Sequence, residues 1–251
     1  MRVWLVLFAF FGFPLFLSGS EPIIDVYVST GDNHFLGSSL PIDSPASIEA
    51  TFDLFRDVQH ARRIYWRGLE ASSWIETMHV RPENPRYYSF WEWLNQLYST
   101  VSPDTLAVKA AHDRGMEIWG MGSLWDWGSP ADTPGFGDYP FTFESKLKLE
   151  HPEWAPVDKH GVRHQGGPIE LAYPEARKAL VDLTVQETLK AGYDGIALLT
   201  YVENYSLRFA DEFGFSDPIV NDFQRQYKID LRTEPFRRGA SREDWLRLRG
   251  S

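Results

Sequence analysis

The feature that most constrains the fold is a predicted helix, turn and strand that end in the apolar run at residues 196–199. The run shows no alternation of apolar and polar residues, which is typical of a strand buried on both faces of a parallel sheet. The preceding helix is predicted to begin at Pro174 and to end at Gly192, a residue suited to a left-handed cap. A helix, a glycine turn and a buried strand make up half of a β-α-β unit, so the sequence predicts an α/β fold.

The predicted helix also carries an apolar stripe. Val181, Val185 and Leu189 lie at helical spacing and are flanked by Leu180 and Leu183. This is the pattern of an amphipathic helix with one apolar face for packing.

The rest of the chain repeats the same alternation of strand and helix. Further strands are predicted at residues 23–29, 63–68 and 116–124, and further helices at 47–58, 88–98, 104–114 and 143–149, with two more beginning at 216 and 241. A long loop at 129–139, a turn at 158–161 and a hairpin over 162–171 complete the prediction.

The repeat favours one architecture over its rivals. No strand is followed by the glycine-rich fingerprint of a dinucleotide-binding fold or by a P-loop. A (β/α)₈ barrel repeats the unit eight times over roughly 250 residues, and this chain holds about four units. We therefore expect a partial TIM barrel: four parallel strands with helices outside, as in the N-terminal half of a (β/α)₈ barrel. Such a half-barrel is either a fragment of a longer barrel or covers its exposed sheet edge by self-association.

The N-terminus has the features of a targeting segment. Arg2 precedes an apolar run at residues 3–17, and small residues follow at 18–20. The run is short for a membrane span, so we predict a cleaved secretory signal peptide at residues 1–20, with an uncleaved anchor as the alternative. The mature domain, residues 21–251, is then expected to be secreted or periplasmic, with no stable membrane span.

Composition narrows the range of partners. The net charge of −10 argues against nucleic acid as the main partner. With no cysteine, the chain offers neither disulfides nor thiolate metal sites, and His151, His160 and His164 lack metal-ligand spacing, so we expect no metal and no cofactor. Aromatic residues make up 15% of the chain. They indicate either a large core or a cleft whose aromatic faces stack on sugar rings.

Several motifs resemble one protein family. They are the segments at residues 110–119, 151–154, 173–177, 193–196, 213–220, 227–234 and 245–250. In their order and spacing they resemble the bacterial secreted glycosyl-hydrolase-like family 10 proteins. The resemblance implies a complete (β/α)₈ barrel that hydrolyses glycosidic bonds. Members of the family often carry an aspartate at the end of the fourth strand, where this chain has Leu198, Leu199 and Thr200, and the nearest acid is Glu203.

Two carboxylates are the catalytic candidates, because glycoside hydrolysis needs one group to protonate the leaving oxygen and a second as base or nucleophile. Glu203 follows the predicted fourth strand between two tyrosines and is the candidate acid. Its alternative is a solvated glutamate or an ion pair with Arg67. Asp126 follows the predicted third strand and is the second acid or a hydroxyl acceptor. Its alternative is a turn-forming residue.

Six further residues are candidates for binding the sugar. They are Trp66, Arg67, Trp125, Trp127, Tyr201 and His34, all at predicted carboxyl ends of strands. The alternatives are an internal ion pair for Arg67 and, for His34 with Asp32, a polar loop that folds on itself.

The sequence thus predicts an enzyme that acts on a polysaccharide or oligosaccharide by carboxylate acid–base catalysis, and that is inactive if the half-barrel stands alone. The alternatives are a non-catalytic carbohydrate-binding barrel and a fragment of a larger assembly.

Overall fold

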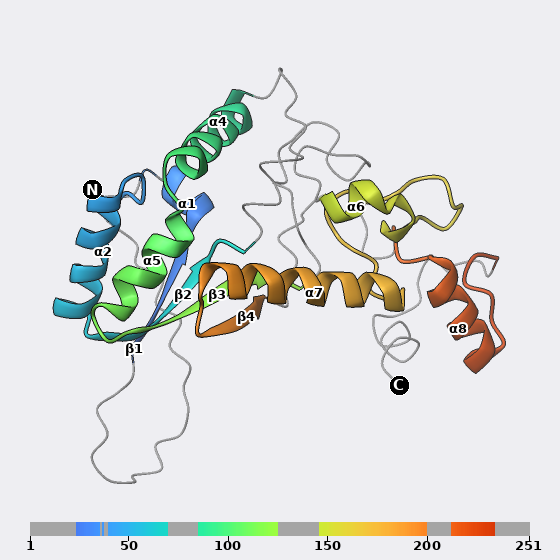
Figure 1. The fold of residues 1–251 in the computed structure, drawn as a ribbon. Coiled ribbons are helices and arrows are strands. Elements are labelled where there is room, and N and C mark those ends of the chain that lie inside the picture. The colour runs from blue at the N-terminus through green and yellow to red at the C-terminus, as the bar shows by residue number, and fades with distance from the viewer. Residues whose placement is uncertain are drawn as a thin grey trace, which may run out of the picture.

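The structure, a computed structural model, describes residues 24–35, 37, 40–69, 85–124, 146–199 and 212–233. Along the chain the elements are β1 (Ile24–Ser29), α1 (Thr30–Phe35), α2 (Pro45–Asp57), β2 (Ala61–Arg67), α4 (Pro85–Thr100), α5 (Pro103–His112), β3 (Glu117–Ser123), α6 (Lys146–Glu150), the 3₁₀ helix η1 (Pro152–Trp154), α7 (Pro174–Ala191), β4 (Gly195–Leu199) and α8 (Asp217–Tyr227) (Figure 1). The predicted helix beginning at residue 241 and the loop at 129–139 lie outside these ranges.

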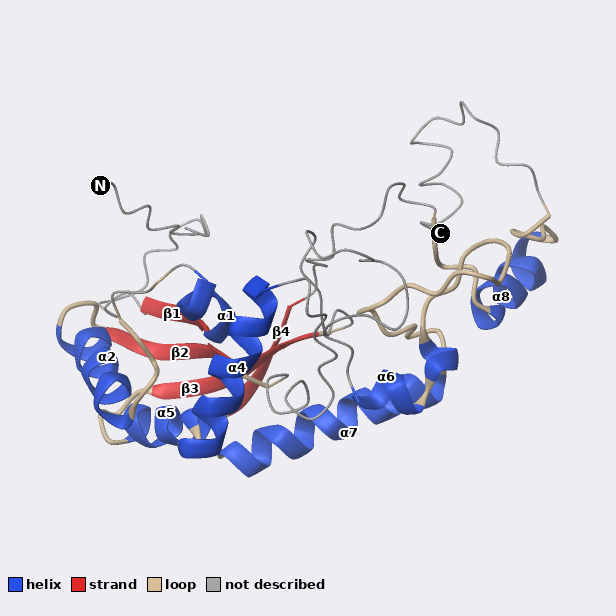
Figure 2. Ribbon diagram, turned by 90° about the horizontal axis from the view of Figure 1, so that it is seen from above, coloured by secondary structure: helices blue, strands red, loops and turns tan. Residues whose placement is uncertain are grey.

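The centre of the fold is a four-stranded sheet in the order β1-β2-β3-β4, with every pair parallel (Figure 2). Each strand lies beside the next strand in the sequence, and the order never reverses. Because parallel crossovers are right-handed, such an order places the connecting helices on one face of the sheet. Figure 1 shows α2 and α5 together on that face. The predicted α/β class with a parallel sheet is confirmed.

The main core lies between the sheet and these helices. Ile64 and Ile118 are neighbours in the register of β2 and β3, and both are fully buried. They belong to one cluster with Phe52 of α2 and Ala110 of α5. Burying a side chain of the size of Ile or Phe contributes about 1.5 to 3 kcal/mol, so this layer is the principal source of stability in the described part of the chain.

Helix ends follow the local sequence. Ser44 and Ser47 form a reciprocal capping box at the start of α2, with Pro45 in the first turn. The helix therefore begins two residues earlier than the apolar periodicity predicts. At the end of α7, Gly192 adopts φ 85° and its N–H donates to the carbonyl of Thr188, which confirms the predicted left-handed cap.

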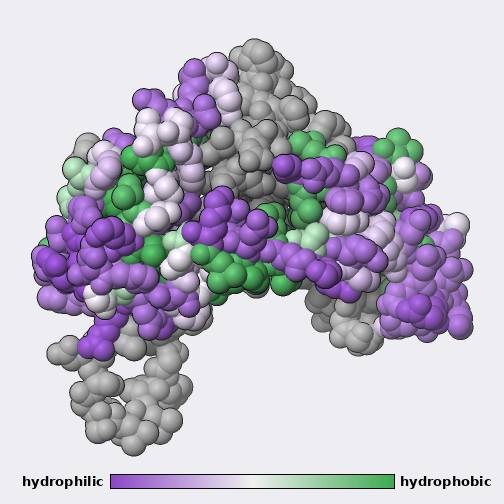
Figure 3. Space-filling model, in the orientation of Figure 1, coloured by the Kyte–Doolittle hydropathy of each residue, from purple (hydrophilic) through white to green (hydrophobic). Residues whose placement is uncertain are grey.

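The apolar stripe of α7 does not face the core. Val181, Val185 and Leu189 are 59%, 42% and 75% exposed. Figure 3 shows apolar surface in the middle of the view, where Figure 1 places α7 and β4. The buried side of the helix includes Thr184 and Thr188 instead. Each threonine hydroxyl donates to the carbonyl four residues earlier, at 2.8 and 2.7 Å, and this bond allows a polar side chain to be buried.

The strand β4 also departs from the prediction. It pairs with β3 and lies at the edge of the described sheet. Leu198 is 47% exposed, so the run is not buried on both faces. An apolar run without alternation therefore identified a parallel strand correctly but not its position in the sheet.

A second, smaller cluster packs on the N-terminal half of α7. Trp154 of η1 and Ile169 are buried there against Ala176 and Leu180 of the helix. The 18 residues of α7 span roughly 27 Å, and the helix reaches from this cluster to the sheet. The hairpin predicted over 162–171 is not formed. In the described residues this segment has isolated bridge positions at His164, which pairs antiparallel with Val157, and at Pro168.

Among the described helices, none combines the length and the apolar character needed to cross a lipid bilayer. The predicted signal peptide at residues 1–20 lies outside the described ranges.

Candidate functional site

The candidate site is the edge of the sheet where all four strands end. Ser29 of β1 is the register partner of Arg67 of β2, and Ser123 of β3 is the partner of Leu199 of β4. The N–H of Leu124 donates to the Leu199 carbonyl at 2.9 Å, which extends the β3–β4 contact one residue past the strand. The chain therefore leaves β3 and β4 at adjacent positions. In parallel α/β folds this carboxyl edge is where ligands bind.

The helix α1 is fixed directly onto this edge. The hydroxyl of Thr30 donates to the carbonyl of Arg67 at 2.9 Å, which ties the first residue after β1 to the end of β2. The N–H of Asp32 donates to the Ser29 hydroxyl at 3.3 Å. Asn33 holds the following loop, because its amide donates to the Leu40 carbonyl and accepts from the N–H of Ile42. The segment predicted as a polar loop thus forms a short helix whose polar residues bond its own neighbourhood.

His34 is a residue of α1, and its ring packs against α4. Its ring centroid is 5.4 Å from that of Phe90 and 5.0 Å from that of Trp93, both on α4. Burial lowers the pKa of His34 below its ordinary value, so the imidazole is neutral at pH 7. A neutral imidazole has one donor and one acceptor nitrogen, and this pair suits a sugar hydroxyl better than an anion.

Arg67 is half-buried at the end of β2. Side chains alternate along a strand, so Arg67 lies on the opposite face from Trp66, away from the core helices. Its register partners are Ser29 and Met121. Arg67 therefore keeps a place at the carboxyl edge, as predicted.

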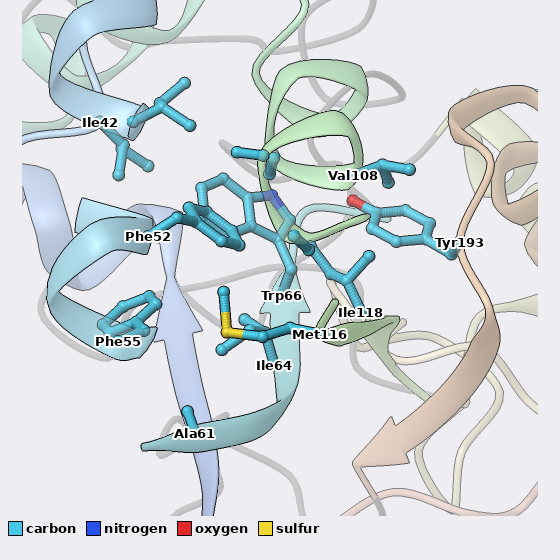
Figure 4. Packing of buried hydrophobic residues seen from close by; sticks show 14 of the residues in the cluster. Ile42, Phe52, Phe55, Ala61, Ile64, Trp66, Val108, Met116, Ile118 and Tyr193 are labelled. Carbon is cyan, nitrogen blue, oxygen red and sulfur yellow. The ribbon is translucent and has the colours of Figure 1, made fainter. Parts of the chain in front are cut away.

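Trp66 does not fit its predicted role as a sugar platform. The side chain is fully buried, with its ring 6.0 Å from that of Phe52 (Figure 4). An indole without exposed surface cannot stack on a ligand, so this expectation is corrected. The reason is visible in the sequence, because Trp66 is two residues after Ile64 and thus shares its core-facing side of the strand.

The structure reveals a polar cluster that the sequence did not suggest. The carboxylate of Asp104, in the first turn of α5, accepts hydrogen bonds from Trp66 Nε1 at 2.8 Å, Tyr98 OH at 2.8 Å and Tyr193 OH at 3.0 Å. Burial raises the pKa of Asp104 above its ordinary value, while the three hydrogen bonds lower it, and burial is the larger effect. We call these four residues the Asp104 cluster. It ties together β2, α4, α5 and the turn before β4.

The remaining site residues predicted from the sequence lie outside the described ranges. These are the acids Asp126 and Glu203 and the aromatic residues Trp125, Trp127 and Tyr201. The last described residues before them, Leu124 and Leu199, are joined by the hydrogen bond given above. Within the described ranges, no cluster of three or more His, Asp or Glu side chains is placed to hold a metal ion.

Comparisons with known proteins do not assign this site. No protein-family model matches the chain, and no curated protein matches it either.

Proposed function

We propose that this protein is a glycoside-hydrolase-like enzyme built on a barrel-type (β/α) sheet, and that it acts on a polysaccharide or oligosaccharide at the carboxyl edge. The observation that carries the proposal is the strand order β1-β2-β3-β4, all parallel. In a doubly wound sheet the spatial order of consecutive strands reverses at a switch point, whereas in a barrel each strand is added on the same side of the one before it. The four described strands follow one another in sequence order across the sheet, which supports a barrel-type architecture.

The strand order also determines which segments meet. Asp126 comes three residues after Ser123, the end of β3, and Glu203 comes four residues after Leu199, the end of β4. Ser123 and Leu199 are register partners, so the two segments that carry the acids begin side by side at the edge. We propose that both acids act from this part of the edge. Two carboxylates across a glycosidic bond are the arrangement that hydrolysis requires.

In the proposed mechanism Glu203 donates a proton to the leaving oxygen. Tyr201 and Tyr205 flank it in the sequence, and the aromatic setting proposed for Glu203 is of the kind that favours a protonated acid. Asp126 acts as the base or nucleophile on the other side of the sugar. As positive charge develops on the sugar ring, the ionised Asp126 stabilises it.

The same edge offers groups for holding the sugar. Arg67 supplies several N–H donors, and His34 supplies a neutral imidazole beside Phe90 and Trp93. Aromatic faces for ring stacking come from the segments after β3 and β4, with Trp125, Trp127 and Tyr201 as the proposed platforms.

Replacing Glu203 with glutamine tests this proposal. The Glu203→Gln variant lacks the transferable proton, and its rate of reducing-end release from a panel of polysaccharides should fall roughly 10² to 10⁴-fold. The matched control is Glu117→Gln, since Glu117 lies on the same sheet at the amino end of β3 and should leave the rate unchanged. Equal rates for Glu203→Gln and wild type would remove Glu203 from the mechanism.

The same panel distinguishes catalysis from binding alone. If glycans quench tryptophan fluorescence, and Trp125→Ala abolishes the quenching, while no preparation releases reducing ends, the chain is a carbohydrate-binding protein. Neither quenching nor hydrolysis with any glycan contradicts both roles.

A further inference from the structure

One apolar surface of the molecule extends over a helix and a strand edge. It comprises Val181, Val185 and Leu189 of α7 together with Leu198 of β4, which are between 42% and 75% exposed. We call these four residues the α7–β4 surface. Contiguous exposed apolar surface of this kind marks a site of interaction with another macromolecule.

The exposed residue of the strand, Leu198, lies on the face of the sheet that the helices cover. Ile196 packs against the main core, which lies on the face covered by the helices. Side chains two residues apart share a face of a strand, so Leu198 lies on that face as well. In the same region, Thr184 and Thr188 fill the buried side of α7, and the three apolar residues of α7 remain on its outer side.

An occupant of this surface must satisfy two requirements. It must cover an apolar helical stripe, and it must pair with the outer edge of β4, whose only strand neighbour among the described elements is β3. Exposed strand edges with apolar side chains favour pairing with another strand. The occupant is therefore a strand with a helix on the same face.

We propose that the occupant is a second copy of this chain, related by a twofold axis that passes near Val185 and runs perpendicular to the sheet. Such an axis places β4 antiparallel to its copy, and antiparallel edges pair directly. In a β-α-β unit the helix runs alongside the strand that follows it. The same axis therefore also places α7 antiparallel to its copy. One symmetry operation thus covers both the strand edge and the stripe.

The stripe is self-complementary about this axis. Val181 and Leu189 are each four residues from Val185, so in antiparallel contact the smaller Val181 meets the larger Leu189 of the other copy, and Val185 meets itself. Alternating small and large side chains across a helix pair is the arrangement that packs without voids.

The charges beside the stripe also permit self-association. Lys178 is paired with Asp182, and Lys190 with Glu187, all within α7. These pairs leave the outer side of the helix close to neutral, although the whole chain carries a net charge of −10. Two copies can therefore approach through α7 without the repulsion that acts between other parts of their surfaces.

Sedimentation equilibrium of the full chain tests the proposal. Wild type should show twice the 28.9 kDa mass of one chain across the micromolar range. Val185→Lys, which brings two like charges together at the axis, should be monomeric with unchanged helical circular dichroism. Val162→Lys is the matched control, because Val162 is 76% exposed outside this surface, and it should remain dimeric. A monomeric wild type overturns the proposal, as does a dimer that Val185→Lys leaves intact.

A cysteine at the axis gives a second test that does not depend on how a charged variant folds. The chain has no cysteine, so Val185→Cys introduces a single thiol that should meet its own copy. Mild oxidation with diamide should give a disulfide-linked dimer for Val185→Cys and little for Val162→Cys. Equal cross-linking of the two variants, or none in either, shows that another partner or no partner occupies the α7–β4 surface. This result is independent of glycan hydrolysis, which Glu203→Gln tests separately.

Discussion

Replacing Asp104 with alanine is expected to lower the free energy of unfolding by roughly 2 to 4 kcal/mol. The substitution removes three hydrogen bonds at once. Two of the abandoned donors, Trp66 Nε1 and the Tyr193 hydroxyl, belong to buried side chains, and buried donors without acceptors carry the full cost of lost hydration. Asp104→Asn keeps one acceptor oxygen and should lose much less. Urea denaturation of the three proteins measures the differences, and equal losses for alanine and asparagine would contradict the assigned hydrogen bonds.

The stability of wild type relative to Asp104→Asn is expected to fall as the pH rises. Burial raises the pKa of Asp104 in the folded protein above the ordinary carboxyl value of 3.8. The folded state therefore holds this proton more tightly than the unfolded state does. Its contribution to stability is largest below pH 3.8 and declines as the pH rises toward the folded pKa. Asp104→Asn has no such proton, so wild type should lose stability relative to this variant as the pH rises through that window. A difference that stays constant with pH would contradict the raised pKa.

The second large effect is expected for Trp66→Ala, which should destabilise the protein by about 3 to 5 kcal/mol. The substitution empties the centre of the core beside Phe52 and removes a hydrogen bond to Asp104. Trp66→Phe separates the two causes, because phenylalanine keeps most of the packing but has no N–H to donate. Its loss should be about that of one hydrogen bond to a charged group, roughly 1.5 to 3 kcal/mol.

Thermal and urea unfolding of these variants can be compared with Tyr27→Ala. Tyr27 lies on the opposite face of the sheet and is 45% exposed, so truncating it creates no internal cavity and should cost far less. A loss for Trp66→Ala no larger than that for Tyr27→Ala would place Trp66 on the surface, as the sequence first suggested, and would restore it as a sugar platform.

Local patterns predicted the elements because their causes are local. The proline, the cap glycine and the helical spacing of α7 are properties of a continuous segment, and its bounds agree with the prediction. Which side of α7 is buried is a different question. Thr184 and Thr188 bond carbonyls of their own helix, so hydrophobicity alone did not identify them as the packing side.

The sequence predicts which edge of the sheet carries the candidate site, but it does not predict the buried hydrogen bonds of the Asp104 cluster. A parallel sheet places all strand ends at one edge, so Arg67 ends β2 there, and α1, which carries His34, is tied to that edge through Thr30. Their role in binding sugar stays a prediction. The burial of Trp66 could have been predicted from its alternation with Ile64. The Asp104 cluster could not, because its partners are 6 to 89 residues away along the chain and only tertiary packing brings them together.

Cross-linking between residues 126 and 203 tests the central claim most directly, namely that the segments after β3 and β4 converge at one mouth. In the Asp126→Cys, Glu203→Cys double variant the only thiols are the two introduced ones. If the acids share a cleft, at the separation of roughly 5 to 10 Å typical of glycoside hydrolases, a short bis-maleimide should link them within one chain. The control pair Glu117→Cys, Glu203→Cys places one thiol at the amino end of β3 and should not be linked. Efficient linkage of the first pair alone is the predicted result, and no intrachain linkage between 126 and 203 would contradict the account.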